Sequence, residues 1–234
     1  ISYNNGYRKP YVPCEERLMK ELNIDLIYRI NDIDIHWSLE TNGNGTRFLP
    51  DYIDHFKTHY PNRKFNNALE WCAGPGFIGF GILASDTCNN LSLLEMYKPA
   101  CELMDNTIEK SNLHNATVVC ADNVGVLTDK YDLIVGNPPH WRKYNSANRL
   151  MGATGREDKL NWIRIAVDTD WAIHREFFTN INRNMTEDGV ILLLENRSEI
   201  LSITQVANEC GFALKEAHDV QSGPEHTILE FVIR

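Results

Sequence analysis

The sequence predicts an α/β fold in which helices cover both faces of a mostly parallel, seven-stranded sheet. From residue 67 onward, apolar runs of strand length alternate with amphipathic stretches of helix length. The runs are continuous rather than alternating, which is typical of strands buried on both faces of a parallel sheet. Seven runs, with helices expected between the first six, predict a doubly wound arrangement.

The last two strands are predicted to form an antiparallel hairpin at one edge of the sheet. They flank Ser222-Gly223-Pro224, a sequence typical of a turn. The seven strands are predicted at residues 68–72, 91–96, 117–120, 133–135, 190–194, 212–214 and 227–233.

The opening residues have a different pattern. A short helical pattern covers residues 14–22, and two strand-like runs at 26–30 and 33–37 flank the polar pair Asn31-Asp32. Two short strands around a polar pair predict a β-hairpin.

Pro50 favours a helix start just before residues 51–60, because proline suits the first helical position. We therefore predict an N-terminal helix and β-hairpin extension over residues 1–60 and one larger domain over residues 61–234. A chain of 234 residues with 43% hydrophobic residues is long enough to bury one substantial core.

Composition predicts a soluble, cytoplasmic protein. The chain has no run of eighteen apolar residues and no signal-peptide pattern, so we expect no membrane association. Its six cysteines are scattered without C-x-x-C spacing, which favours free thiols in a reducing compartment.

Charge gives two opposing indications about partners. A net charge of -9 argues against a surface built to bind phosphates. Residues 141–165, however, hold six basic residues against two acidic ones, which would suit a small anionic partner surface or an ordinary solvated face.

A glycine turn follows the first strand of the sheet. Gly74-Pro75-Gly76 lies between strand 68–72 and a helical pattern. Glycines there permit positive φ and close approach of a ligand to the backbone, although a tight turn without a ligand would look the same.

Polar residues follow the next two strands at the same edge. Glu95 ends the second strand, where a carboxylate can accept hydrogen bonds from both ribose hydroxyls. Asp122 and Asn123 follow the third strand and suit the amino group of an adenine, against which Met96 and Tyr97 could pack. Each of these residues also suits an ordinary loop or core position.

The fourth strand ends in Asn137-Pro138-Pro139-His140. Two prolines cannot continue a central strand, so the chain leaves the sheet on a stiff path that presents Asn137 rigidly. Four such features in order at four successive strand ends favour a functional site over a simple turn.

These segments resemble class I S-adenosylmethionine-dependent methyltransferases of the Asn-Pro-Pro-aromatic group, over about residues 45–234. That group includes release-factor glutamine methyltransferases, amino-methylating adenine enzymes of DNA and RNA, and ribosomal RNA guanine methyltransferases. The resemblance implies a Rossmann-like class I methyltransferase fold and S-adenosyl-L-methionine as the cofactor. It also implies methyl transfer to a planar nitrogen, a reaction that requires no metal.

The resemblance also implies residue roles. Asn137 and the Pro138 carbonyl would bind the target nitrogen, with Pro139 and His140 completing the catalytic segment. His140 stands where the group has Tyr, Phe or Trp, so either His140 or Trp141 would stack on the substrate. The implied cofactor-binding residues are Glu70, Cys72, Ala73, Gly74, Gly76, Ile78, Glu95, Met96, Tyr97, Asp122, Asn123 and Asn137.

The acceptor stays open between two classes. The C-terminal half resembles the glutamine methyltransferases, so a protein glutamine, such as one in a translation factor, is the first expectation. An exocyclic amino group of adenine or guanine in RNA or DNA is the second.

Two other functional classes remain as alternatives. A nicotinamide-dependent oxidoreductase would share the glycine turn and the acid, but it would not need Asn-Pro-Pro. A non-catalytic cofactor-binding protein would not need to keep Asn137.

Overall fold

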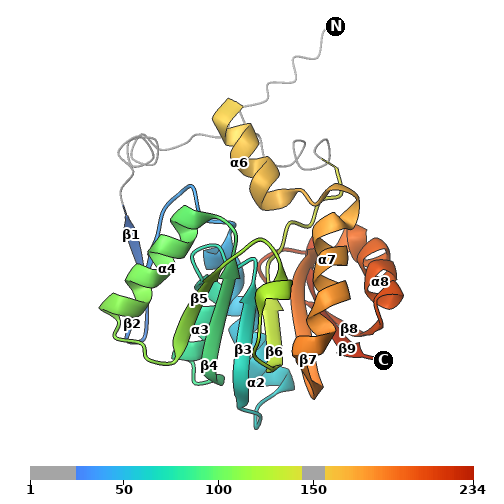
Figure 1. Ribbon diagram of the computed structural model, residues 1–234, viewed down its shortest axis with the longest axis horizontal. Coiled ribbons are helices and arrows are strands. Elements are labelled where there is room, and N and C mark those ends of the chain that lie inside the picture. The colour runs from blue at the N-terminus through green and yellow to red at the C-terminus, as the bar shows by residue number, and fades with distance from the viewer. Residues whose placement is uncertain (1–24, 144–155) are drawn as a thin grey trace, which may run out of the picture.

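The computed structural model describes residues 25–143 and 156–234. These residues form a seven-stranded sheet flanked by helices, together with a separate two-stranded hairpin (Figure 1). The predicted fold class is confirmed. The helix predicted at residues 14–22 lies outside the described residues.

The sheet has the strand order β5-β4-β3-β6-β7-β9-β8. The first five strands in that order are parallel, and β9 runs antiparallel to both β7 and β8. All seven predicted runs are strands, and most extend into polar residues that the apolar pattern could not include. The strands are β3 Phe65–Trp71, β4 Cys88–Glu95, β5 Ala116–Cys120, β6 Tyr131–Gly136, β7 Met185–Asn196, β8 Phe212–Asp219 and β9 His226–Ile233.

Each face of the sheet carries its own layer of helices and its own buried apolar cluster. The helices α2 (Gly45–His59), α3 (Phe77–Ala84) and α4 (Lys98–Lys110) contribute to one cluster. The helices α7 (Ala172–Ile181) and α8 (Ile200–Glu209) contribute to the other. Helices on both faces explain why the strands are apolar throughout.

The predicted helix start at Pro50 is wrong. Helix α2 begins at Gly45, with Asn44 in the left-handed conformation at φ 67°, and Pro50 lies inside the helix. The preceding turn carries Phe48 and Leu49, both buried. Tertiary packing of this apolar face therefore extends the helix beyond the proline signal.

The helix expected between the third and fourth strands is also absent. Within residues 121–130, which are all described, the connection from β5 to β6 holds a single 3-10 turn, η1 (Val124–Val126). So short a connection leaves no room for a helix with a loop at each end. Other 3-10 turns lie at η2 Thr169–Trp171, η3 Asn182–Asn184 and η4 Arg197–Glu199.

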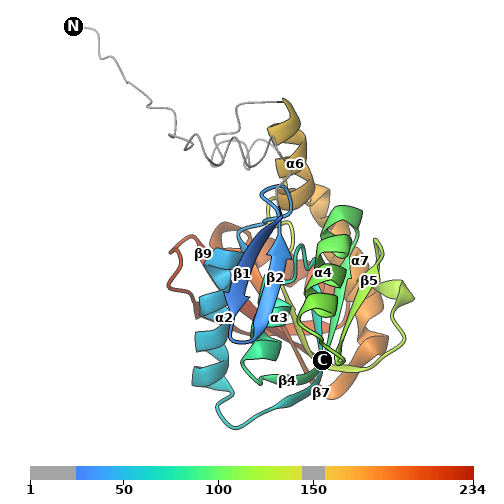
Figure 2. The ribbon, with the colours of Figure 1, turned by 90° about the vertical axis from the view of Figure 1, so that its left-hand side faces the viewer.

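The predicted N-terminal hairpin forms at the predicted residues, as β1 (Leu26–Ile30) and β2 (Ile33–Trp37). It lies against α4 (Figure 2), where the His36 amide donates to the Thr107 hydroxyl at 2.9 Å. Helix α2, on the N-terminal side of residue 60, packs closely on α3, on its C-terminal side. The domain boundary at residue 60 stays a prediction.

Helix α6 (Arg156–Ala166) stands away from the sheet and its flanking helices (Figure 1). None of the helices in the described part of the chain combines the length and apolarity needed to cross a membrane.

Candidate active site

The strand order changes direction between β3 and β6, which are neighbours although α3, β4, α4 and β5 separate them in sequence. Trp71 and Gly136 pair at their carboxyl ends. Ligands of open α/β sheets bind at such a switch point, and a pocket lies there. This switch-point pocket is lined by Thr41, Gly43, Gly45, Glu70, Trp71, Cys72, Ala73, Gly74, Pro75, Phe77, Ile78, Leu94, Glu95, Met96, Ala121, Asp122, Asn137, Pro139, Arg164, Ile165 and Ile173.

The glycine turn after β3 has the backbone that its sequence predicts. Gly74 and Gly76 have φ of 54° and 80°, which favour glycine. A Cβ at Gly74 would lie 3.2 Å from the Thr41 carbonyl oxygen, and one at Gly76 would lie 2.7 Å from the Phe80 ring. The turn can therefore approach a ligand with its backbone.

Glu70 holds this turn against the start of α3. Its side chain is 2% exposed, and its Oε2 accepts a hydrogen bond from the Gly79 amide at 2.7 Å. Burial raises the pKa of Glu70 to about 8, even though hydrogen bonds from the amides of Gly79 and Ile78 oppose the rise. The carboxyl group thus fixes the loop that forms the pocket floor.

Glu95 braces the opposite wall. Its two oxygens accept hydrogen bonds from the Gly74 amide at 2.8 Å and the Tyr97 amide at 2.7 Å. A carboxylate has about four lone-pair sites, so two acceptor positions remain for hydroxyl groups in the pocket. Glu95 is therefore both a structural brace and a suitable ligand group.

Most of the predicted cofactor-binding residues line this pocket. They are Glu70, Cys72, Ala73, Gly74, Ile78, Glu95, Met96, Asp122 and Asn137.

The other three predicted residues lie beside the lining. Gly76 precedes α3 as its N-cap. The Tyr97 hydroxyl donates to the Glu40 carboxylate, and the Arg164 guanidinium lies 3.7 Å from the centre of the Tyr97 ring. Asn123 donates to Asp122 at 2.7 Å.

One wall of the pocket comes from segments that we did not predict. The Glu40 carbonyl oxygen accepts hydrogen bonds from Asn161 at 3.2 Å and from Arg164 at 3.1 Å. This joins α6 to the loop that carries Thr41 and Gly43. The basic stretch of the sequence did include Arg164, but no pattern linked it to residue 40.

Asn137 follows β6 directly, and its side-chain amide is held at one end. Its Nδ2 donates to the Gly43 carbonyl oxygen at 2.7 Å. Its Oδ1 is buried and has no hydrogen-bond partner among the described residues. Tyr52 of α2 donates to the Gly136 carbonyl at 2.7 Å and fixes the backbone just before Asn137.

A second cavity, of about 340 Å³, shares Gly43, Asn137 and Ile165 with the first. Asn137 therefore belongs to the walls of both. Pro139 lines the switch-point pocket, whereas Pro138 lines the second cavity. This adjoining pocket is lined by Gly43, Asn44, Arg47, Phe48, Asn137, Pro138, His140, Trp141, Ile165, Ala166, Glu225 and His226.

His140 and Trp141 are both 8% exposed and place their aromatic rings in this wall. The His140 ring centre lies 5.3 Å from that of His226 and 5.8 Å from that of Trp141. Burial, and then the neighbouring imidazoles of His226 and His174, lower the pKa of His140 to about 3. The His140 ring is therefore neutral at physiological pH.

A buried polar network supports the segment that follows the motif. His174 donates to Asp168 at 2.7 Å through Nδ1 and to Glu195 at 2.8 Å through Nε2, and its side chain is fully buried. Burial alone would lower the pKa of His174, but the two carboxylates outweigh it and raise that pKa to about 9. The Asp168 amide donates to the Trp141 carbonyl at 3.0 Å, which links the network to the motif.

Comparisons with known proteins identify the family and the fold of the chain. The profile of the methyltransferase small domain family matches residues 37–153, which is half of the chain. No curated protein matches the chain in sequence.

Solved structures share the fold. A methyltransferase from Pyrococcus furiosus has a TM-score of 0.60 at 15% identity, over 93% of this chain and 95% of that one. The ribosomal protein L11 methylase of Lactobacillus delbrueckii subsp. bulgaricus has a TM-score of 0.56 at 11% identity, over 82% of this chain and 80% of that one. The glycopeptide N-methyltransferase MtfA, solved with S-adenosyl-L-methionine, has a TM-score of 0.57 at 11% identity, over 85% of this chain and 97% of that one. The chain belongs to the methyltransferase small domain family and is an S-adenosylmethionine-dependent methyltransferase.

Proposed function

We propose that the protein methylates a planar nitrogen held in the adjoining pocket, and that this nitrogen is the side-chain amide of a protein glutamine. The methyl donor would occupy the switch-point pocket. The observation that carries the proposal is the buried Oδ1 of Asn137, which has no hydrogen-bond partner within residues 25–143 and 156–234 and belongs to the wall shared by the two pockets.

The residues of the switch-point pocket suit the donor in chemistry and shape. The glycine turn would hold the methionine end, where a Cβ at Gly74 would crowd the backbone. Glu95 keeps acceptor positions for the two ribose hydroxyls. Asp122 is exposed at the pocket edge and would accept a hydrogen bond from the adenine amino group.

Asn137 supplies the chemistry that an amide acceptor needs. An amide nitrogen is a poor nucleophile because its lone pair is delocalised. Acceptance of its two N–H groups by Asn137 Oδ1 and the Pro138 carbonyl favours a pyramidal nitrogen, which is closer to the transition state. The bound donor would supply an electrophilic methyl group on a sulfonium, and the proton lost from the methylated amide would pass to water.

The remaining requirement is alignment. In-line attack on the sulfonium methyl depends on close, directed approach more than on a strong base. The hydrogen bond from Asn137 Nδ2 to Gly43 and the one from Tyr52 to Gly136 fix Asn137 Oδ1 in place before the substrate arrives. The neutral His140 and the buried Trp141 would then contact the flat face of the acceptor.

Charge near the pockets supports a protein acceptor over a polyanion. Arg47 pairs with Glu225, Arg142 pairs with Asp170, and Arg164 binds the Glu40 carbonyl. These guanidinium groups are already engaged, whereas affinity for nucleic acid draws on basic groups that neutralise phosphates.

A second candidate acceptor, an exocyclic amino group of adenine or guanine, is favoured by the aromatic lining of the adjoining pocket. Phe48, His140 and Trp141 contribute rings to a cavity of about 340 Å³. Enzymes that modify a base commonly hold it between aromatic or apolar side chains.

The role of Asn137 is tested by Asn137→Ala. We expect methyl transfer to fall by about 10²–10³-fold, the usual cost of removing one group that stabilises the transition state. Donor affinity, measured by calorimetry, should change little.

The matched control is Asn115→Ala. Asn115 also donates its side-chain amide to a backbone carbonyl, that of Asn89 at 2.6 Å, but it precedes the amino end of edge strand β5, whereas Asn137 follows the carboxyl end of central strand β6. Transfer that survives in Asn137→Ala, or that falls equally in Asn115→Ala, would refute the assigned role.

The acceptor class is tested with donor labelled on the methyl group. Lysate fractions of protein, RNA and DNA are incubated separately, and labelled products are digested for mass spectrometry. The proposal predicts methylated glutamine in the protein fraction. A methylated adenine or guanine in the RNA or DNA fraction would instead identify a base as the methyl acceptor, which is the second candidate.

A further inference from the structure

Three histidine side chains meet between α2 and the edge strand β8, and none of them lines either pocket. His55 and His59 lie four residues apart on α2 and so share one helix face. His218 of β8 faces them. The ring centres of His55 and His59 are 4.6 Å apart. The ring centre of His218 lies 4.5 Å from that of His55 and 4.4 Å from that of His59.

The ring nitrogens converge as well as the rings. One nitrogen from each of the three residues lies within 4.8 Å of the other two. His55 is 5% exposed, and its Nε2 is buried without a hydrogen-bond partner among the described residues. A buried polar atom without a partner costs free energy, so a ligand that binds this nitrogen would remove that cost.

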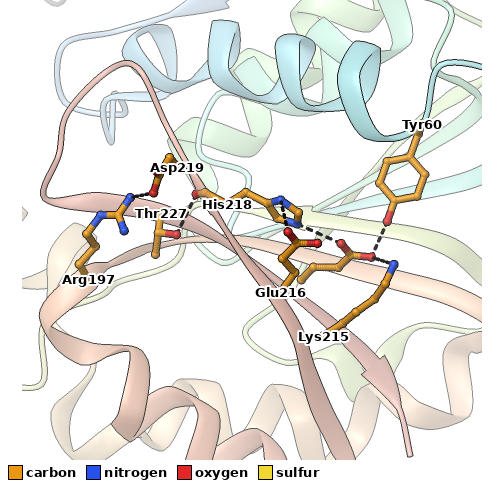
Figure 3. A network of polar contacts seen from close by, with 8 residues as sticks. Tyr60, Arg197, Lys215, Glu216, His218, Asp219 and Thr227 are labelled. Carbon is orange, nitrogen blue, oxygen red and sulfur yellow. Dashed lines mark hydrogen bonds and ion pairs between the residues drawn. The ribbon is translucent and has the colours of Figure 1, made fainter.

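Glu230 orients the third ring. His218 Nε2 hydrogen-bonds Glu230 Oε2 at 3.0 Å, and Glu230 Oε1 also accepts from Tyr60 at 2.5 Å and Lys215 at 2.7 Å (Figure 3). Burial alone would raise the pKa of Glu230, but these three hydrogen bonds outweigh it and lower the pKa. In a neutral ring whose Nε2 donates to Glu230, the lone pair is on Nδ1, which also lies 4.0 Å from Glu216 Oε1.

We propose that His55, His59 and His218 bind a divalent transition-metal ion of the Zn²⁺ class, separately from methyl transfer. Imidazole nitrogens are preferred ligands of Zn²⁺, and a carboxylate behind one ligating ring is the usual outer support of such sites. Three protein ligands would leave the fourth tetrahedral position to water.

The cluster is close to metal-binding geometry. Zinc–nitrogen bonds of about 2.0–2.1 Å place tetrahedral ligands about 3.4 Å apart. The three nitrogens lie within 4.8 Å of one another, so they need to approach by at most about 1.4 Å. His59 is the exposed member of the set. Its side chain can make that movement, and its exposure gives an ion access from solvent.

The ion would hold α2 to the edge of the sheet. The same helix carries Tyr52, which donates to Gly136 next to Asn137. Zn²⁺ binding would therefore stabilise the helix that fixes the reactive segment, although Zn²⁺ would take no part in the reaction.

The test uses the full chain, stripped with chelator and then titrated with Zn²⁺ by calorimetry. We expect one equivalent to bind and to raise Tm. In His59→Ala, which removes an exposed ligand, affinity should fall by at least about 100-fold, because loss of an outer-shell partner alone costs about 10–100-fold. His114→Ala removes an exposed histidine outside the cluster and should bind as wild type does.

Co²⁺ provides a second readout that does not depend on stability. Coordination by three imidazoles should give a visible absorption band in wild type and in His114→Ala, and the band should weaken in His59→Ala and His218→Gln. The proposal is overturned if wild type binds no Zn²⁺. It is equally overturned if His59→Ala and His218→Gln bind Zn²⁺ with wild-type affinity and leave the Co²⁺ band unchanged.

Discussion

At Asn137 the two ends of one side-chain amide have different environments. Nδ2 is satisfied by Gly43, whereas the buried Oδ1 has no partner in the described chain. The sequence could predict the rigid position of Asn137 from the two prolines that follow it. It could not predict the bond to Gly43, because nothing in either segment marks a contact between residues 94 positions apart.

His140 provides a residue-level prediction about the pH dependence of the reaction. Because its pKa is lowered to about 3, its neutral ring would act by contact rather than by proton transfer. We therefore expect His140→Phe to keep the shape of the kcat profile between about pH 6 and 9. A shift of the acid limb in this variant would show that His140 exchanges a proton.

His140→Ala tests the contact itself. Loss of a stacked aromatic contact costs about 1–3 kcal/mol for a nucleic-acid base, so kcat/KM should fall by about 5- to 150-fold for a base acceptor and by less for a glutamine amide. Steady-state kinetics at saturating donor measure this effect. Unchanged kinetics would assign the contact to Trp141 instead.

At the level of elements, the strands could be predicted from their apolar runs, because burial on both faces leaves a continuous pattern. The pocket wall formed by Glu40, Thr41 and α6 could not be predicted from the sequence. It depends on hydrogen bonds from Asn161 and Arg164 to a backbone carbonyl, which any residue type at position 40 could supply. The start of α2 was missed because packing of Phe48 and Leu49 outweighed the proline signal.

The network of Asp168, His174 and Glu195 joins η2, α7 and β7. His174→Ala would leave two buried carboxylates without their cation, so we expect the free energy of unfolding to fall by about 3–5 kcal/mol. Urea denaturation measures it, with His114→Ala as the exposed control, expected within about 0.5 kcal/mol of wild type. Equal stability of the two variants would contradict the buried ion-pair assignment.

At the level of the whole molecule, stability should decline with rising pH on the alkaline side. A folded-state pKa of about 9 for His174, against 6.5 in the unfolded chain, contributes stability that is complete below pH 6.5. It is lost as pH rises through about 9 and amounts to about 3 kcal/mol. Glu70, raised to about 8 from 4.5, acts in the same direction from about pH 4.5 upward.

On the acid side, His140 changes the stability in the opposite direction, so that stability falls as pH falls. Its folded-state pKa is depressed, so the unfolded chain binds the proton first, and this stability is lost as pH falls below 6.5 toward 3. Urea midpoints measured across pH check the acid and the alkaline limbs of the stability–pH curve. His174→Gln should flatten the alkaline limb and leave the acid limb in place; an unchanged alkaline limb would contradict the role given to His174.

The hydrogen bond between Gly43 and Asn137 also limits how far the chain can be shortened. A chain cut just before β3 would keep all seven strands of the sheet, yet it would lose the carbonyl that distinguishes one end of the Asn137 amide from the other. The amide could then turn over and offer its own hydrogens to the incoming nitrogen. The same cut would also remove Thr41, Gly43 and Gly45 from the wall of the switch-point pocket and Tyr52 from beneath Gly136, so such a truncated chain would bind its donor less well and would also repel the group it is meant to modify.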